Sequence, residues 1–517
     1  MLAGNILKLS AEHSPNQLAI ICKTGNLSYD DLDKLANRLA HGLLALGANK
    51  NTKVAIISAN RAEYAITYFA AARAGCVLAH LSTRSTKKNL VDMLEKIDAE
   101  ILIFESEYLS LIQKTIKHLP QLKQLISIDQ AVPKNSQYNI RQFDSLIKKM
   151  PSHEPDVELS VTDPLGITFT GGTTGNPKAV LVSHLARATS ATSAAVDFGI
   201  TNNDVVAITT PLFHSAGLFV WFVPSVMIGA TIVMQPKWDA NNFMDLTQLN
   251  EITAAFFVPS QINELINHKN FSQKKLASLR NIGYAGSPMT KNLLNRARSR
   301  LPKVNFVENY GQSEICPITI RKTDHGDERI ETVGCAAQHI ELKIVNPKGD
   351  TATTGNAGEI IVRGKAAFEK YYGDPMGTAD VFRFGEGWIW TGDIGFLDEE
   401  GFLTLIDRSK DMLISGGENI YPIEIENQLY EHKAVHECAV FGIPDDKWGE
   451  VPAAHIVLTK NTSVTANELI SFCAKRIPRH KRPRVIKFVD KLPKTAVGKI
   501  KKRSLKKPYW TNCNKKI

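Results

Sequence analysis

The chain has few cysteines and no long apolar run. Its 517 residues include seven cysteines, and no two of them form a Cys-x-x-Cys pair. The sequence therefore predicts neither a disulfide framework nor a cysteine zinc site. No apolar stretch has the length of a membrane span, and the first residues do not resemble a signal peptide. Together these absences favour free thiols in a reducing compartment, and we expect a cytoplasmic protein without a transmembrane segment.

Composition is ordinary for a globular protein, with 43% hydrophobic and 22% charged residues. A chain of this length is too long for one compact core, so we expect at least two domains. The net charge of +10 is concentrated near the C-terminus, in segments 479–484 and 494–507. No nucleic-acid-binding signature accompanies it. The basic region is therefore interpreted as an entrance for a polyanionic cofactor, with a solvated surface or peripheral contact with an acidic membrane as alternatives.

Helical and strand patterns alternate through the first 310 residues. Apolar residues at helical spacing predict a helix over 29–46, and residues 54–57 predict a buried strand. Such alternation predicts an α/β fold in which helices cover parallel sheets and ligand loops follow the carboxyl ends of the strands. The other predicted strands are 76–81, 101–104, 165–169, 205–209, 231–234, 255–258, 281–284 and 305–308, and the other predicted helices are 61–73, 90–97, 214–228, 242–250, 261–268 and 290–300.

From about residue 340 the predicted strands become shorter, and a turn at Asp398–Gly401 predicts a hairpin. A small α+β unit follows Asp407, with a capping box at Thr465 and Glu468 before its second helix. We therefore predict a large N-terminal domain over 1–409, with layered sheets and a β-rich subdomain, and a small α+β domain over 410–517. The predicted elements of this half are strands 341–345, 359–363, 394–397, 402–406, 437–441, 453–458 and 485–489 and helices 422–431 and 466–476.

The densest cluster of glycine and hydroxyl residues is Thr168-Phe-Thr-Gly-Gly-Thr-Thr-Gly-Asn-Pro-Lys178, and its first residues end an apolar strand-like run. Glycine lets backbone N–H groups approach an anion closely, and hydroxyl and lysine side chains add donors to phosphate oxygens. The segment is not a Walker loop, because the residues before and after Lys178 break that pattern. A phosphate-binding loop is predicted, and a plain glycine/threonine turn is the alternative for this motif taken alone.

Five further motifs follow the loop in order. They are Pro211-Leu-Phe-His214, Asn309-Tyr-Gly-Gln-Ser-Glu314, Trp390-Thr-Gly-Asp393, Asp407-Arg-Ser-Lys-Asp411 and Pro493-Lys-Thr-Ala-Val-Gly-Lys499. In order and spacing the set resembles the adenylate-forming superfamily of acyl-CoA synthetases, adenylation domains and luciferases, from about residue 27 to 502. The resemblance implies an acid–thiol ligase that uses ATP and Mg²⁺ to adenylate a carboxylic acid, releases pyrophosphate and transfers the acyl group to CoA. It also implies a mobile small domain that rotates about Lys410.

The resemblance assigns nucleotide-binding roles residue by residue. Glu314 would be the Mg²⁺ carboxylate, since hard oxygen ligands suit that ion. Gly171 stands where the family usually has serine and Ala179 where it usually has glycine, which leaves the backbone donors of the loop in place. The residues expected to bind ATP or AMP are Thr170, Gly171, Gly172, Thr173, Thr174, Gly175, Lys178, Gly286, Asn309, Tyr310, Gly311, Gln312, Ser313, Asp393 and Arg408.

The resemblance also assigns the chemistry and the other two substrates. Lys499 would bridge the acid and the α-phosphate, and His214 would line the acyl tunnel and gate entry of the thiol. The expected acyl pocket looks apolar, which favours a fatty or aromatic acid. No aspartate occurs within 214–222, which disfavours an amino acid. The expected acyl-pocket residues are His214, Trp221, Phe222, Val258, Gly283 and Ala285, and the expected CoA residues are Gly416, Gly417, Glu418 and Lys481.

Two alternatives differ in acceptor or in class. The acyl group could pass to the phosphopantetheine of a carrier protein, which the basic C-terminal face could receive. The chain could instead be a non-catalytic protein that binds acyl groups or adenylates. The presence of Lys499, Glu314, Asp393 and Arg408 argues against the second alternative.

Overall fold

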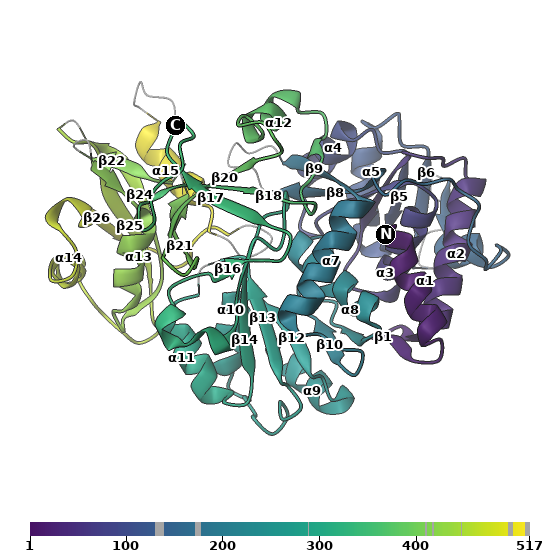
Figure 1. The fold of residues 1–517 in the computed structure, drawn as a ribbon, viewed down its shortest axis with the longest axis horizontal. Helices are drawn as coiled ribbons and strands as arrows, with labels where there is room; N and C mark the ends of the chain where they lie inside the picture. Colours follow the sequence, from purple (N-terminus) through teal and green to yellow (C-terminus); the bar gives the residue numbers. More distant parts are fainter. Residues whose placement is uncertain are drawn as a thin grey trace.

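A computed structural model describes residues 1–129, 139–170, 177–287, 289–408, 411–415, 418–445, 447–494 and 500–511. Two large sheets and the helices around them form most of the molecule, and the C-terminal elements gather at one end (Figure 1). No helix among these residues is both long and apolar enough to cross a membrane.

The first large sheet has the strand order β19-β9-β8-β4-β3-β5-β6-β7. Successive residues of β3 point to opposite faces. Val54 and Ile56 enter a core shared with α2 and α3, and Ala55 and Ile57 pack in the core that includes α4. The elements of this half are α1 (Ala3–His13), α2 (Tyr29–Ala45), β3 (Lys53–Ile57), α3 (Ala62–Arg73), β4 (Val77–His80), α4 (Lys87–Lys96), β5 (Ile101–Phe104), α5 (Leu109–Ile116), β6 (Gln124–Ser127), β7 (Ile140–Gln142), α6 (Phe143–Ile147), β8 (Pro164–Thr170), β9 (Lys178–Ser183) and β19 (Lys370–Tyr371).

The second large sheet has the order β16-β15-β14-β13-β12-β10-β11-β1-β2, with β10 to β14 parallel. Phe256 of β12 faces the helices shared with the first sheet, and Phe257 faces the outer core that includes α9 and α10. Its elements are β1 (Leu18–Cys22), β2 (Gly25–Ser28), α7 (His184–Phe198), β10 (Val205–Ile208), the π-helix η2 (Ala216–Phe222), α8 (Val223–Ile228), β11 (Thr231–Met234), α9 (Ala240–Asn250), β12 (Ala254–Phe257), α10 (Pro259–Ile266), β13 (Asn281–Ala285), α11 (Lys291–Arg300), β14 (Asn305–Tyr310), β15 (Thr319–Arg321) and β16 (Cys335–Ala336).

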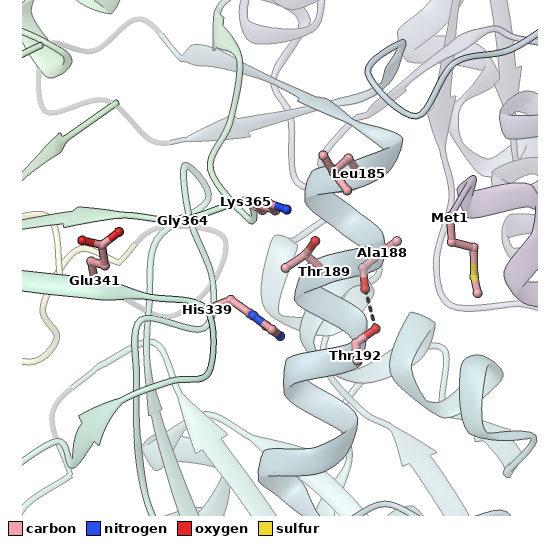
Figure 2. Close-up of a pocket in the computed structure, with 9 residues that line it drawn as sticks. All are labelled: Met1, Leu185, Ala188, Thr189, Thr192, His339, Glu341, Gly364 and Lys365. Carbon is pink, nitrogen blue, oxygen red and sulfur yellow. Dashed lines mark hydrogen bonds between the residues drawn. The ribbon is translucent and has the colours of Figure 1, made fainter. Parts of the chain in front are cut away.

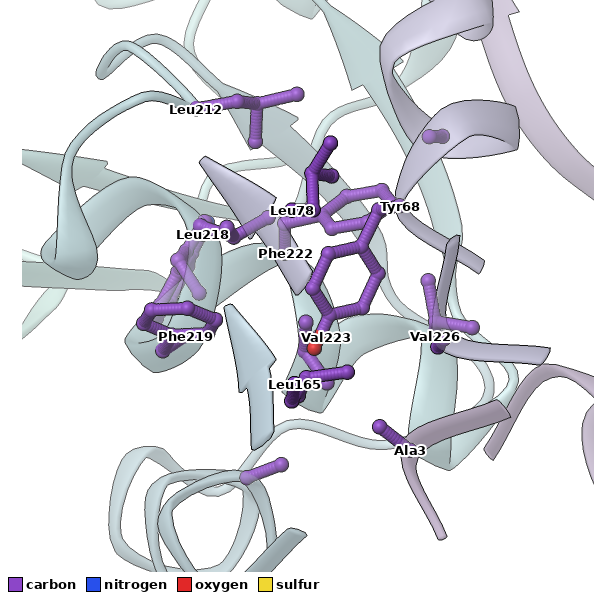
Figure 3. Close-up of a cluster of buried hydrophobic side chains, with 14 of the residues drawn as sticks. Ala3, Tyr68, Leu78, Leu165, Leu212, Leu218, Phe219, Phe222, Val223 and Val226 are labelled. Atoms are coloured by element: carbon purple, nitrogen blue, oxygen red, sulfur yellow. The ribbon is translucent and has the colours of Figure 1, made fainter. Parts of the chain in front are cut away.

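A single apolar core lies between the two large sheets. Side chains of α1, α3, η2 and α8 meet there, and Figure 3 shows Ala3, Tyr68, Phe222 and Val226 from these four elements together. The molecule is therefore layered, with a shared helical layer between the sheets and outer helices beyond each of them. This arrangement confirms the predicted α/β fold class of layered sheets and helices.

The remaining elements form two smaller sheets. Strands β17-β18-β20-β21 make an antiparallel sheet, and β23-β22-β25-β24 with β26 make the C-terminal one. The carboxylate of Asp407, near the end of β21, accepts a hydrogen bond of 3.0 Å from the N–H of Ile423 in the first turn of α13. The elements are β17 (Glu341–Val345), β18 (Gly358–Arg363), α12 (Pro375–Val381), β20 (Ile389–Leu397), β21 (Leu403–Arg408), β22 (Leu413–Ser415), β23 (Glu418–Ile420), α13 (Pro422–Tyr430), β24 (Val435–Asp445), β25 (Gly449–Leu458), α14 (Ala466–Ala474), β26 (Val485–Phe488) and α15 (Lys502–Trp510).

Several elements differ from the sequence-based expectation, and helices α1, α5, α7 and α15 were not predicted. The predicted helix over 214–228 begins with seven residues of π-helix before α8. Strand β9 was not predicted, and it pairs antiparallel with β8 around the glycine-rich segment. Strand β20 starts at Ile389 rather than 394, because Ile389 and Trp390 already pair with β18.

Candidate active site

The predicted adenine and acid residues lie at the carboxyl ends of adjacent parallel strands. Ala285 at the end of β13 pairs with Asn309 near the end of β14. Gly286 follows with φ of 93°, a backbone conformation that favours glycine. The side-chain nitrogen of buried Asn309 has no hydrogen-bond partner among the described residues. An unpaired buried amide donor beside a strand end suits the edge of a nucleotide base.

Asp393 connects β20 to the loop after β14. Its carboxylate oxygen Oδ2 accepts hydrogen bonds from the Tyr310 hydroxyl at 2.6 Å and from Gln312 Nε2 at 2.7 Å. Gln312 also donates to the carbonyl of Thr391 at 2.8 Å. Arg408 lies opposite Asp393 in the β20–β21 register. The structure thus brings two of the predicted nucleotide residues, Tyr310 and Gln312, onto the buried carboxylate of a third, Asp393.

Ser313 meets residues from two other segments. Ser215, which follows His214, donates its hydroxyl to Ser313 Oγ at 2.8 Å and to Thr168 Oγ1 at 3.4 Å. The half-buried imidazole of His214 accepts at Nδ1 from the N–H of Ala216 at 3.3 Å. The segments predicted to bind the α-phosphate, to form the phosphate loop and to line the acyl tunnel therefore meet through three hydroxyl groups.

Glu314 is oriented by a residue that the sequence analysis missed. The Tyr371 hydroxyl donates to Glu314 Oε1 at 2.6 Å, and the Lys178 ammonium lies 4.1 Å from the centroid of the Tyr371 ring. Burial raises the pKa of Tyr371, with Glu314 adding to that effect, so the phenol stays protonated and donates. Tyr371 lies in the two-residue strand β19 and in none of the motifs, so only its pairing with β9 relates it to the site.

Helix α7 holds the loop that carries Ser313 and Glu314. Ser190 donates its hydroxyl to the carbonyl of Cys316 at 2.6 Å, and the buried Arg187 guanidinium donates to the Cys316 sulfur at 3.3 Å. Arg187 also donates to the carbonyl of Ala366 at 3.2 Å. From that segment the N–H of Phe368 reaches the Glu314 carbonyl at 2.7 Å. The backbone of Glu314 is therefore fixed on two sides.

The donor set fits Mg²⁺ that arrives with a nucleotide. Among the described residues, no cluster of three or more His, Cys, Asp or Glu side chains could hold a metal ion. Protein sites for Mg²⁺ commonly supply one or two carboxylates while substrate phosphates and waters supply the remaining ligands. Glu314 can be such a carboxylate.

Three of the predicted acyl-pocket residues, Trp221, Phe222 and Ala285, belong to the core between the two large sheets. Trp221 and Phe222 are fully buried in η2. Trp221 donates its indole N–H to the carbonyl of Ala207 at 3.1 Å, whereas the ring of Phe222 lies 6.2 Å from that of Phe69 in α3. Val258 Cγ1 lies 3.4 Å from the Cβ position of Gly286. Both side chains therefore lie in the shared core, with Trp221 toward β10 of the second sheet and Phe222 toward α3.

A separate hollow of about 470 Å³ lies beside α7. It is lined by Leu185, Thr189 and Thr192 of that helix and by His339, Gly364 and Lys365 opposite them (Figure 2). It includes none of the predicted site residues.

Several predicted residues lie outside the described part of the chain. Lys481 is described, and its ammonium forms an ion pair with Glu424 at 2.5 Å. The residues outside the description are Gly171, Gly172, Thr173, Thr174, Gly175, Lys410, Gly416, Gly417 and Lys499, as are the side chains of Arg408 and Glu418.

Family models cover nearly the whole chain. The model described as AMP-binding enzyme matches residues 7–372, and the one described as AMP-binding enzyme C-terminal domain matches residues 424–499. The chain belongs to the AMP-binding enzyme family. Within this family it is an ATP-dependent acid–thiol ligase of the acyl-CoA synthetase class, as the motifs predicted.

Curated relatives of this AMP-binding enzyme match over almost their full length. Indoleacetate–CoA ligase of Aromatoleum aromaticum is 34% identical over 490 residues, or 94% of each chain. Feruloyl-CoA synthase of an Amycolatopsis species is 30% identical over 96% of this chain and 97% of that one. Long-chain-fatty-acid–CoA ligase FadD13 of Mycobacterium tuberculosis is 30% identical over 98% of each. The relatives thus include both kinds of acid that the sequence favoured.

Solved structures of adenylate complexes have the same fold. The anthranilate CoA ligase AuaEII in complex with anthranoyl-AMP superposes with a TM-score of 0.90 at 25% identity, covering 98% of this chain and 97% of that one. o-Succinylbenzoate CoA synthetase from Bacillus subtilis, in complex with its acyl-adenylate, gives 0.85 at 30% identity, with 97% and 98% covered.

Proposed function

We propose that this enzyme adenylates a carboxylic acid at the carboxyl ends of β13 and β14 and passes the acyl group to CoA. The observation that carries the proposal is the buried Asp393 carboxylate with Tyr310 and Gln312 bound to it. A carboxylate can accept both hydroxyls of a ribose, and the adjacent Tyr310 ring offers a stacking face for adenine. Ser313 and Glu314 follow on the same loop, where a hydroxyl and a carboxylate suit the phosphates and their Mg²⁺.

In the first half-reaction an oxygen of the acid attacks the α-phosphorus, and the bond to pyrophosphate breaks. Positioning and charge stabilisation account for most of the catalysis in such a displacement. Glu314 would hold Mg²⁺, which neutralises charge on the phosphate oxygens, while Ser313 bonds the α-phosphate and Lys499 contacts the acid. Arg187, Ser190 and Tyr371 keep Glu314 in place.

In the second half-reaction the CoA thiol attacks the acyl carbonyl and AMP leaves. The CoA thiol is proposed to enter the site past the His214 side chain. CoA is proposed rather than a carrier protein because the relatives are named as CoA synthases and ligases. The basic segments 479–484 and 494–507 also suit the phosphates of CoA. Rotation of the small domain, proposed to begin at residue 410 and to turn about Lys410, would exchange Lys499 for the segment 416–418 between the two steps.

The acid is proposed to be aromatic or aliphatic, since Val258, Ala285 and the buried side chains of η2 are apolar. Indoleacetate–CoA ligase and feruloyl-CoA synthase support an aromatic acid, and FadD13 supports an aliphatic one.

Acid-dependent exchange of pyrophosphate into ATP tests the first step. We expect Mg²⁺-dependent exchange with one class of acid, and a loss of about 100-fold or more in Lys499→Ala because a charge contact of the transition state is removed. The same variant should still form the CoA thioester from preformed acyl-AMP.

The matched control is Lys501→Ala, which removes an exposed lysine two residues further on and should exchange like the parent enzyme. Full exchange in Lys499→Ala would refute the role given to Lys499. Absence of exchange with every acid would refute adenylation.

A further inference from the structure

Three aromatic side chains pack together beside Gly283, and two of them, Phe198 and Phe256, fill the space directly against it. They are Phe198 at the end of α7, Trp221 of η2 and Phe256 of β12, and we call them the aromatic wall. The Phe198 and Trp221 rings meet edge-on with centroids 5.2 Å apart, and the Trp221 and Phe256 centroids are 5.5 Å apart. All three side chains are 2% exposed or less. The wall is thus a continuous, fully buried surface contributed by three separate elements.

Two rings of the aromatic wall pack directly against the backbone of Gly283. A Cβ at this position would lie 2.8 Å from Phe198 Cε1 and 2.9 Å from Phe256 Cδ2, closer than carbon atoms pack without displacement. The absence of a side chain at Gly283 therefore does not leave a passage, because the two rings occupy that space. Trp221 is fixed as well, through its hydrogen bond to Ala207.

The wall lies a short distance below the reacting end of the site. Phe256 pairs with Gly283 in the β12–β13 register, whereas Ala285 pairs with Asn309 at the nucleotide end. Because a strand rises about 3.3 Å per residue, the two levels are ~7 Å apart. Alternate strand residues share a face, so Gly283 and Ala285 both face the shared core. An acid that enters past Ala285 meets the wall after about the length of one ring.

We propose that the aromatic wall closes the acid pocket at Gly283 and restricts this enzyme to compact acids, with one ring or a short chain, and excludes long-chain fatty acids. The inference rests on the proposed function and names the substrate class of the same site. Of the two classes that the relatives represent, it excludes the long-chain fatty acids of FadD13 and retains acids with one ring. Packed side chains resist insertion of extra methylene groups, so exclusion follows from the rings themselves.

Binding of stable adenylate analogues to the full-length enzyme tests the wall without requiring turnover. The probes are sulfamoyl adenosines that carry a phenylacetyl, a butanoyl or a dodecanoyl group, measured by calorimetry. We expect the phenylacetyl or the butanoyl analogue to bind at least about 100-fold more tightly than the dodecanoyl one. Equal or tighter binding of the dodecanoyl analogue would refute exclusion of long chains by the aromatic wall, while the proposal of adenylation would be retained. Failure of all three to bind would overturn both proposals.

Substitutions test whether the Phe198 ring causes the preference for compact analogues. Phe198→Ala and the milder Phe198→Leu should narrow the preference for the phenylacetyl over the dodecanoyl analogue by about 10-fold or more, since each opens the space behind Gly283. The matched control is Phe257→Ala, which removes the same ring from the opposite face of β12 and should leave the preference unchanged. An unchanged preference in both Phe198 variants, or an equal change in the control, would contradict the assignment. If neither alanine variant folds, the same comparison is made between Phe198→Leu and the parent enzyme. An unchanged preference in Phe198→Leu then contradicts the assignment.

Discussion

At the residue scale, the Tyr371 hydroxyl sets the direction of the Glu314 carboxylate. Tyr371→Phe removes this donor but keeps the ring beneath Lys178. The buried carboxylate then lacks its partner, and we expect a loss of about 1–3 kcal/mol in the free energy of unfolding. We also expect the Mg²⁺ concentration for half-maximal pyrophosphate exchange to rise several-fold.

Tyr372→Phe is the matched control, because the neighbouring ring lies beneath Lys53 instead. A Mg²⁺ requirement that is unchanged in Tyr371→Phe, or one that rises equally in Tyr372→Phe, would show that the phenol does not orient the metal carboxylate.

His80 makes the fold sensitive to acid. Burial lowers the pKa of His80 to about 3, and the ring accepts or donates one hydrogen bond with the Tyr64 hydroxyl at 2.8 Å. The unfolded chain takes up a proton near pH 6.5, whereas the folded protein does not until about pH 3. Stability therefore falls as pH decreases below 6.5, by about 2 kcal/mol at pH 5 from this group alone.

His80→Asn should remove that part of the acid sensitivity while retaining a polar partner for Tyr64. Denaturation midpoints at pH 7.5 and pH 5 give the comparison, and the difference between the two pH values should shrink in the variant. A difference as large as that of the parent protein would mean that other groups, such as His184 with a pKa lowered to about 4, account for it.

The sequence predicted candidate site residues that lie in motifs. It did not predict residues whose roles depend on contacts formed in the fold. Glu314, Asp393 and Tyr310 could be predicted because each lies in a motif with a recognisable order. Tyr371 and Phe198 could not, because their roles depend on which strand or helix end packs beside the site. A single sequence contains no direct record of that packing.

At the element scale, an ion pair buried in the second sheet fixes the strand that presents Asn309 and Tyr310. Arg321 of β15 donates to Glu308 of β14 at 2.6 Å and to the Tyr284 hydroxyl of β13 at 2.5 Å. Burial raises the pKa of Glu308, and the guanidinium offsets only part of that effect. Arg321→Met should cost about 3–5 kcal/mol in the free energy of unfolding, because it leaves a buried carboxyl group unpaired.

The double variant Glu308→Leu/Arg321→Met should recover most of that loss, since no buried charge remains. Urea denaturation of the single and double variants measures both effects. A double variant no more stable than Arg321→Met would show that lost packing, rather than the unpaired charge, is responsible.

The regular elements were largely predictable because their periodicities are strong. Helix α2, strand β5 and the capping box at Thr465 and Glu468 agree with the expectations from spacing. The π-helix over Ala216–Phe222 was not predictable, because its apolar residues fit an α-helix equally well. Strand β9 was not predicted, because the glycine-rich segment directly before it is typical of a loop.

At the scale of the whole molecule, a hydrogen bond ties the C-terminal elements to the strand before them. The Asp407 carboxylate accepts from the N–H of Ile423 at the positive end of α13. Asp407→Asn should weaken this contact by about 1 kcal/mol. Since opening would then be more frequent, limited proteolysis between residues 408 and 422 should be about 5-fold faster.

Glu399→Gln serves as the control, because it removes the same charge from an exposed position in the hairpin turn. Equal cleavage rates in Asp407→Asn and the parent protein would show that the contact does not restrain the C-terminal elements.

Strand β1, which lies between β11 and the edge strand β2, has a consequence for synthesis of the protein. It pairs with β11 through Ile20 and Ile232, so roughly 210 residues separate the partners. At about 5–20 residues per second, the ribosome delivers β11 some 10–40 s after β1. During that interval the apolar strand Leu18–Cys22 has no native neighbour on one side, and an unpaired edge readily joins other chains. Translation speed and chaperones that bind nascent chains should therefore limit the yield of this enzyme more than its final stability does.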